Sequence, residues 1–156
     1  MNKVIMNDEV FIKKGFFIST DNSLLDFDNV YRYLNEDSYW AKGITKEKLL
    51  RAIDNSLCFG VYHDKKQIGF ARLITDKATF AYLADVFILD AYRSQGLSKW
   101  LMQTIMSHPE VQGLRRWVLA TADAHGLYKQ FGFGPLAKPD RWMDIFTPYP
   151  VPEGQE

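Results

Sequence analysis

A long apolar run at residues 78–89 restricts the fold of this chain more than any other feature. The run is shorter than the roughly 20 residues that cross a bilayer, and Asp85 interrupts it. Its length and the turn-forming pair at residues 76–77 are typical of a buried strand. A buried strand that leads into an amphipathic helix is typical of a domain in which helices cover a sheet. Such a helix follows after a short polar loop, with apolar residues at helical spacing: Leu97, Trp100, Leu101, Ile105 and Met106.

The neighbouring segments extend this sheet. Residues 16–19 are predicted to end a first strand, and the runs at residues 57–63 and 67–75 are predicted to be two more, because turn-forming residues separate them. The three strands from residue 57 to residue 89 should form an antiparallel meander. A further strand is predicted at residues 115–121, after the amphipathic helix. A right-handed crossover then places it parallel to residues 78–89.

Helices are predicted along the chain both before and after the meander. Asp26 is a candidate N-cap for a first helix, and Thr45 caps a second one. A short helix is predicted at residues 124–130, and short strands after it. The predicted fold class is α/β in the mixed, α+β sense: a central sheet, antiparallel in its first half and parallel in its second, flanked by about four helices. The inward-facing residues predicted for the second helix are Leu49, Leu50 and Ile53.

Composition limits the class of protein and its partners. With 47% hydrophobic and 24% charged residues, the 156-residue chain is expected to fold as one domain over residues 1–147, with a polar tail at residues 148–156. Nineteen basic residues balance nineteen acidic ones, so no net charge attracts nucleic acid or an anionic membrane. Cys58 has no partner for a disulfide, and no signal-like stretch opens the chain. A cytoplasmic location is therefore expected.

The loop at residues 90–98 is the best candidate for chemistry. It lies between the buried strand and the helix, where main-chain N–H groups and the helix dipole favour an anion. Gly96 lets the backbone approach a diphosphate closely, Ser98 is small, and Arg93 adds charge-assisted contacts. The loop lacks the Gly-Lys-Ser/Thr of a P-loop and the glycine spacing of a dinucleotide fold. The sequence therefore predicts a phosphate-bearing cofactor of another kind.

Two segments resemble one known family. Residues 86–98, with the sequence Val-Phe-Ile-Leu-Asp-Ala-Tyr-Arg-Ser-Gln-Gly-Leu-Ser, resemble the acetyl-CoA signature Arg/Gln-x-x-Gly-x-Gly/Ala of the GNAT acyltransferases. Residues 124–133 resemble the late helix of that family, with its tyrosine and Gly-Phe ending. The resemblance covers most of residues 57–133, whereas residues 1–56 match only in a strand and two helices. This chain departs from the family's preferred residues at three positions: Asp90, Ser98 and Asp123.

The resemblance implies acetyl-CoA as co-substrate and places it on named residues. The pantetheine arm would pair with the backbone of Val86, Phe87 and Ile88. Tyr128 resembles the acid that protonates the departing thiolate, which a phenol of pKa ~10 can do for a thiol near ~8.5. From spacing alone, Tyr128 is instead a tyrosine that packs its ring and hydrogen-bonds its hydroxyl. The residues implied around the diphosphate are Arg93, Ser94, Gln95, Gly96, Leu97 and Ser98.

Asp85 is the second candidate catalytic residue. An unpaired carboxylate in a buried strand is costly, so Asp85 should have a partner or a task. It could act as general base toward an ammonium acceptor, directly or through water. The alternative is a structural ion pair with Arg72 or a backbone cap. Histidine and cysteine do not cluster, so no metal site is expected, and Cys58 is interpreted as a core residue.

The predicted activity is transfer of an acetyl group from acetyl-CoA to a primary amine, by direct attack in a ternary complex. The alternatives are a non-catalytic acyl-CoA-binding module and a protein-interaction domain. The acceptor is a small molecule or a peptide: antibiotics, polyamines, amino acids and protein N-termini all stay open. Tyr39 and Trp40 either line the acceptor pocket or pack in the core. Exposed sheet edges allow a homodimer, and neither nucleic acid nor membrane is expected as partner.

Overall fold

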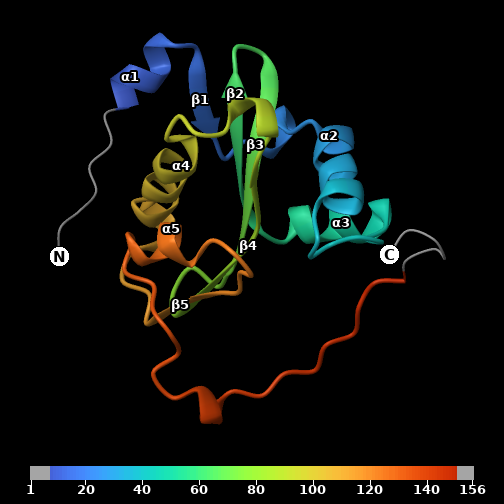
Figure 1. The fold of residues 1–156 in the computed structure, drawn as a ribbon, viewed down its shortest axis with the longest axis vertical. Coiled ribbons are helices and arrows are strands. Elements are labelled where there is room, and N and C mark those ends of the chain that lie inside the picture. Colours follow the sequence, from blue (N-terminus) through green and yellow to red (C-terminus); the bar gives the residue numbers. More distant parts are fainter. Residues whose placement is uncertain (1–7, 151–156) are drawn as a thin grey trace.

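The computed structural model describes residues 8–150, which form a five-stranded sheet with helices on both faces (Figure 1). The strands are β1 (Phe16–Ser19), β2 (Leu57–His63), β3 (Lys66–Thr75), β4 (Phe80–Ile88) and β5 (Arg116–Leu119). The helices are α1 (Asp8–Lys13), α2 (Phe27–Arg32), α3 (Lys46–Asp54), α4 (Leu97–Met106) and α5 (His125–Lys129).

The sheet has the order β1-β2-β3-β4-β5. Its first three pairings are antiparallel, and β4 pairs with β5 in parallel across the crossover helix α4. The predicted mixed sheet is therefore confirmed, antiparallel in its first half and parallel in its second. Helix α1 was not predicted, because six residues are too few to show a helical period.

Two hydrophobic cores lie on opposite faces of the sheet. Helices α1, α4 and α5 cover one face, and α2 and α3 cover the other (Figure 1). Trp100 and Leu101 of α4 are buried in the larger core, and Leu34 and Leu49 are buried in the smaller one. Both faces of the sheet are therefore covered at its central strands, which explains why residues 78–89 are almost continuously apolar.

Local side chains fix the ends of the elements as predicted. The Asp26 carboxylate accepts the Asn29 N–H at the start of α2, and the Thr45 hydroxyl accepts the Lys48 N–H at the start of α3. Such caps contribute about 1 kcal/mol each. Leu49 and Ile53 are buried as expected, but the prediction for Leu50 is wrong, because its side chain is 51% exposed. Leu50 directly follows Leu49, so a helix that buries Leu49 and Ile53 turns Leu50 toward solvent.

The chain after α5 departs from the sequence prediction. Between residues 130 and 150 the structure forms no strand, only a 3₁₀ turn at Pro139–Arg141. The segment runs clear of the sheet and reaches the α2–α3 side of the molecule (Figure 1). There Tyr149 packs on the smaller core, and the Lys48 ammonium lies 5.2 Å from its ring centre. The predicted short strands are wrong for the single chain, because this segment has no neighbouring strand to pair with.

Candidate active site

Strands β4 and β5 separate partway along their length. They pair only from Phe80 to Leu83 on β4, although β4 continues to Ile88. A β-bulge interrupts the pairing of β4 with β3 after Ala84, and Asp85 has a left-handed φ of 56° there. The Leu89 N–H donates to the Ile68 carbonyl on β3 at 2.8 Å. Because peptide groups alternate along a strand, the N–H groups of Ile88 and Val86 face the opposite, unpaired edge.

The loop between β4 and α4 presents a row of unused donors. Ser94 and Gly96 have φ values of 65° and 86°, and α4 begins at Leu97 without a side-chain cap. In the part of the chain that the structure describes, no hydrogen bond engages the main-chain N–H groups of residues 94–98. A helix N-terminus with uncapped N–H groups is a favourable site for an anion. The loop thus offers free main-chain donors, and its binding of a phosphate stays a prediction.

The side chain of Arg93 fixes this loop to neighbouring segments of the chain. Its Nε donates to the Ile88 carbonyl at 3.1 Å, and its Nη2 donates to the Tyr33 hydroxyl at 3.1 Å. Its Nη1 also lies 2.9 Å from the Asp90 carboxylate. These contacts engage three of the five N–H donors of the guanidinium, whose side chain is 54% exposed, and the predicted contact with a phosphate stays a prediction. Arg93 therefore ties the loop to the end of β4 and to the segment that follows α2.

Tyr128 lies in α5 and borders a cavity of about 430 Å³. Its ring packs against Phe133 at 6.0 Å between centres, and its side chain is buried. Among the described residues no hydrogen bond engages its hydroxyl, and the oxygen is not fully enclosed by protein. Burial raises the pKa of Tyr128, and the nearby Tyr39 and Asp123 raise it further. Tyr128 is thus a protonated phenol with a free hydroxyl, which differs from the satisfied packing tyrosine that spacing alone suggests.

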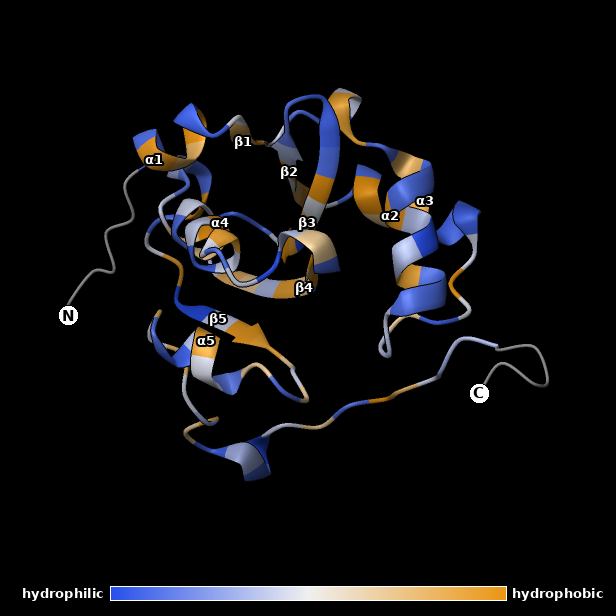
Figure 2. Ribbon diagram, turned by 45° about the horizontal axis from the view of Figure 1, so that its top comes forward, coloured by the Kyte–Doolittle hydropathy of each residue, from blue (hydrophilic) through white to orange (hydrophobic). Residues whose placement is uncertain are grey.

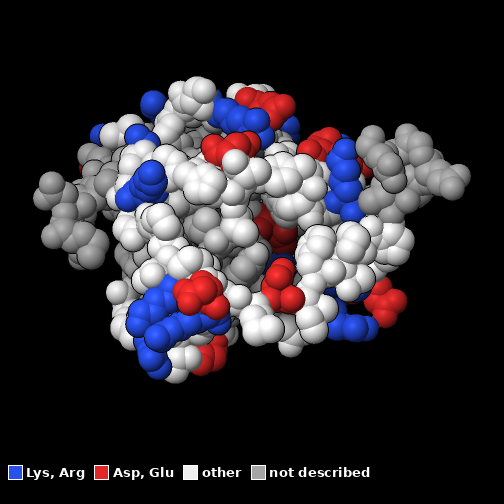
Figure 3. Space-filling model, turned by 60° about the horizontal axis from the view of Figure 1, so that its bottom comes forward, with Lys and Arg blue, Asp and Glu red and all other residues white. Residues whose placement is uncertain are grey.

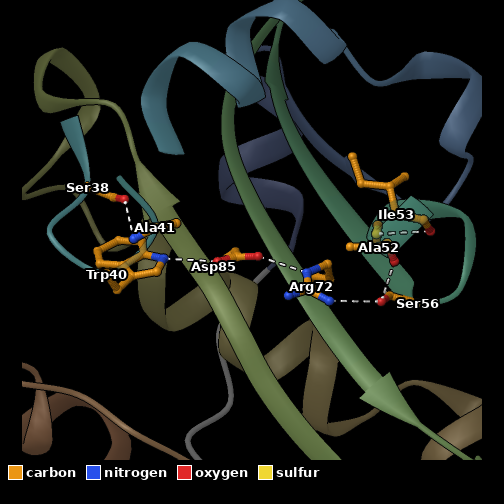
Figure 4. A network of polar contacts seen from close by, with 9 residues as sticks. Ser38, Trp40, Ala41, Ala52, Ile53, Ser56, Arg72 and Asp85 are labelled. Carbon is orange, nitrogen blue, oxygen red and sulfur yellow. Dashed lines mark hydrogen bonds and ion pairs between the residues drawn. The ribbon is translucent and has the colours of Figure 1, made fainter. Parts of the chain in front are cut away.

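Asp85 joins a polar network in the middle of β4 (Figure 4). Its Oδ2 accepts from Arg72 Nε at 2.8 Å, and its Oδ1 accepts from the Trp40 indole at 2.9 Å. Arg72 also donates to the Ser56 hydroxyl at 3.2 Å. The ion pair that the sequence offered as an alternative is therefore present. The Trp40 contact has no signal in the sequence, since 45 positions separate its two residues.

The buried ion pair gives a stability prediction. Replacing Arg72 by methionine leaves the Asp85 carboxylate buried beside a single neutral donor, so we expect the free energy of unfolding to fall by about 3 kcal/mol. Urea unfolding followed by circular dichroism measures this loss. The double variant R72M/D85N should recover most of it, because no charge is left buried and asparagine tolerates the left-handed φ at this position. Equal losses in both variants would contradict a charge effect.

The segment between α2 and α3 contacts residues on both sides of the gap where β4 and β5 are no longer paired. Trp40 binds Asp85 on β4, and the Tyr39 hydroxyl accepts the Ala122 N–H beyond β5 at 3.0 Å. Seen from the lower side of Figure 1, the molecule is hollowed, and acidic atoms show in the hollow and at its rim (Figure 3). Acidic groups around a hollow favour a cationic guest. Tyr39 and Trp40 are 58% and 38% exposed, so neither packs in the core, and their place beside an acceptor stays a prediction.

Other candidates take no part in this arrangement. Cys58 is buried, and burial raises the pKa of its thiol to about 12, so no nucleophilic thiolate forms near neutral pH. His125 is exposed at the first turn of α5. Residues 8–150 contain no group of histidine, cysteine and carboxylate side chains that could hold a metal ion. Within the same residues, no helix is long and apolar enough to span a membrane.

Comparison with known proteins identifies the class of protein to which this chain belongs. The profile of the Acetyltransferase (GNAT) family matches residues 27–133. A candidate GNAT acetyltransferase from Xanthomonas campestris, known from its crystal structure, is 53% identical with a TM-score of 0.84, over 85% of this chain and 94% of that one. A candidate acetyltransferase of Gibberella zeae is 32% identical, over 80% of this chain and 81% of that protein. Fold, loop and similarity thus define an acetyltransferase, and the chain belongs to the GNAT family.

A more distant structure shows the same fold with a ligand. The crystal structure of a predicted acetyltransferase from Clostridium acetobutylicum contains acetyl-CoA, and it matches with a TM-score of 0.62 and 16% identity, over 84% of this chain and 94% of that one. The family uses acetyl-CoA and acetylates amine acceptors. The predicted class of enzyme is therefore confirmed.

Proposed function

We propose that this protein transfers the acetyl group of acetyl-CoA to a primary amine by direct attack of the amine on the thioester. The observation that carries the proposal is the row of unused N–H donors at residues 94–98, and the unpaired edge of β4 beyond Leu83 supports it. The diphosphate would accept hydrogen bonds from the loop, and the pantetheine arm would pair with Val86 and Ile88 like an added strand. Arg93 would contribute by holding the loop.

The reaction needs an oxyanion donor and an acid. Attack by the amine makes a tetrahedral oxyanion, and one preorganised N–H group on the open edge of β4 would stabilise it by about 3 kcal/mol. The C–S bond then breaks, and the Tyr128 hydroxyl would give its proton to the departing thiolate. Its raised pKa keeps the phenol protonated until charge develops on sulfur. The amine nitrogen loses its own proton to water or to a base.

The contacts of Asp85 favour a positioning role over that of a direct base. Each of its oxygens already accepts one hydrogen bond, from Trp40 or from Arg72. The arginine also compensates its charge, although each oxygen keeps a lone pair. We therefore propose that Asp85 holds Trp40 beside the acceptor and that the ammonium proton leaves through water. The role of Asp85 as general base stays a prediction.

The proposal is tested with acetyl-CoA and a panel of amines. Free thiol should appear only when protein and an accepted amine are both present, and polyamines, amino acids and peptides with free N-termini cover the main acceptor classes. Thiol release with none of these amines, although acetyl-CoA binds, would favour the non-catalytic acyl-CoA-binding module. A folded sample that gives no calorimetric heat with CoA would refute both readings.

The pH profile of the reaction follows from two pKa values. An alkyl amine with a pKa near 10.4 is mostly ammonium at neutral pH, so with such an acceptor kcat/KM should rise about tenfold per unit between pH 7 and 9, whereas with an α-amine of pKa about 8 it should level off. Tyr128 does not oppose this rise, because its raised pKa keeps the phenol protonated throughout that range. Initial rates in buffers of constant ionic strength measure the slope. A profile that falls between pH 8 and 9 would contradict Tyr128 as the acid.

A further inference from the structure

The connection from β5 to α5 carries an unpaired carboxylate. Asp123 is exposed on this connection, and in the part of the chain that the structure describes neither a hydrogen bond nor an ion pair engages its side chain. The Tyr39 hydroxyl accepts the N–H of the preceding residue, Ala122, at 3.0 Å. The Thr121 hydroxyl accepts the N–H of the following residue, Ala124, at 3.1 Å. Figure 2 shows this connection extending from the end of β5 toward the side of the molecule that carries α2 and α3. Asp123 is therefore a free charge on a main chain that is held in place.

The carboxylate on the β4 side of the gap, Asp85, differs from Asp123 because its charge is already compensated. Arg72 pairs with it at 2.8 Å, and Trp40 donates to its other oxygen at 2.9 Å. Asp123 instead lies near Tyr128, since its charge raises the pKa of that phenol. No hydrogen bond joins the two side chains, and the Tyr128 side chain is only 8% exposed. A cation that pairs with Asp123 would therefore lie beside the proposed acid without occupying its hydroxyl.

Two exposed aromatic rings lie near this free charge. The rings of Tyr39 and Trp40 are perpendicular, with their centres 5.0 Å apart. Their polar atoms are bound to Ala122 and Asp85, which holds both rings at the gap between β4 and β5. The face of an aromatic ring attracts a cation, and its apolar surface accepts an alkyl chain. A free carboxylate beside two fixed aromatic rings is therefore a favourable environment for an alkylammonium ion.

The nitrogen that reacts is a poor partner for Asp123. A carboxylate beside an ammonium group stabilises the charged form, and the charged form cannot attack a thioester. A second cation on the same acceptor takes no part in the reaction, so its contact with a carboxylate persists from the bound state to the transition state. Such a contact orients the acceptor without opposing the loss of the proton. The free charge of Asp123 therefore fits an acceptor that has a second amino group.

We propose that the acceptor is an alkyl diamine or polyamine whose second ammonium group binds between Asp123 and the rings of Tyr39 and Trp40. This inference rests on the proposed acetyl transfer and names the class of amine. One amino group attacks the thioester near Tyr128, while the other stays charged and holds the molecule in place. A monoamine lacks the second contact, and an amino acid would bring its own carboxylate toward Asp123, which repels it.

A matched pair of amines tests this selectivity. Putrescine and butylamine have the same chain length and differ in one amino group. The ratio of their kcat/KM values, corrected for the two equivalent amino groups of putrescine, therefore measures the second contact. We expect a preference for putrescine of about tenfold, which an exposed ion pair and a cation–π contact give together. The preference should decrease as the salt concentration rises, because salt screens exposed charges.

Two variants assign the preference to its residue. Asp123→Asn removes the charge at constant size, so it should lower the preference for putrescine about fivefold. Asp28→Asn is the matched control, because Asp28 is an exposed carboxylate of α2 that pairs with Lys46, and its variant should keep the wild-type preference. Circular dichroism spectra verify that both variants are folded.

The same assay separates a failure of this inference from a failure of the proposed function. Thiol release with both amines at equal kcat/KM would overturn the inference and leave acetyl transfer intact. A preference for putrescine that Asp123→Asn leaves unchanged would overturn it as well. No thiol release with any amine would refute acetyl transfer itself, and this inference with it.

Discussion

Replacing Tyr128 by phenylalanine is expected to lower kcat for acetyl transfer by about 100-fold or more. A general acid contributes about 10²–10⁴-fold, and the thiolate would have to leave without a proton in this variant. The affinity for acetyl-CoA should stay nearly constant, because the change removes one oxygen and no backbone donor. Stability should change by less than about 0.5 kcal/mol, since the hydroxyl has no partner among the described residues. Thiol release, calorimetry and urea unfolding measure the three quantities.

The matched control is Tyr31→Phe, which removes the hydroxyl of a half-buried tyrosine in α2. That hydroxyl accepts a hydrogen bond from Asn35 at 3.3 Å and borders neither the loop nor the cavity. Its variant should keep the wild-type kcat. If Tyr128→Phe also kept it, the proton for the thiolate would come from water, and Tyr128 would only pack against Phe133.

Replacing Ser98 by glutamate is expected to weaken CoA binding by about 100-fold. Ser98 lies in the first turn of α4, where the proposed diphosphate would sit. A carboxylate a few ångströms from a diphosphate costs about 1–4 kcal/mol, depending on how far water screens the two charges. The same carboxylate should stabilise the helix by about 0.3–1 kcal/mol through its dipole. The affinity for CoA, measured by calorimetry, should therefore fall, while the free energy of unfolding in urea should rise.

The neutral variant Ser98→Gln is the control for this experiment. It adds a side chain of the same length without charge, so it reports the steric effect alone. We expect its affinity for CoA to lie much nearer that of the wild-type protein. Equal affinities of the glutamate and glutamine variants would show that no diphosphate binds at the start of α4.

The parts of the structure that the sequence predicts well depend on local signals. The meander from β2 to β4 follows from short apolar runs separated by turn residues. One of these, Asp76, accepts hydrogen bonds from Thr79, Ala78 and Phe80 that lower its pKa. The caps Asp26 and Thr45 act within three residues of themselves. The loop at residues 90–98 was recognised because its donors belong to the main chain and need only the order strand, loop and helix.

The parts that the sequence did not predict depend on contacts between distant residues. The contacts of the Arg93 side chain with Tyr33 and Asp90 have no signal in the sequence, which predicts only a phosphate contact for it. The hydrogen bond from Trp40 to Asp85 joins residues that are 45 positions apart. The described segment after α5 forms none of the predicted short strands, since a strand forms only where the chain meets a neighbour to pair with. None of these contacts produces a periodicity or a motif spacing that a single sequence reveals.

The three contacts of Arg93 have a consequence for how fast a cofactor can bind. They anchor the loop to the end of β4, to the turn at Asp90 and to Tyr33, and all three partners belong to this chain. The conformational entropy of ordering the loop is therefore lost during folding and not during association. A cofactor that binds at this loop as proposed would meet a preorganised site, so its capture should be limited by diffusion and by release of water from the phosphates, and not by a slow rearrangement of the protein.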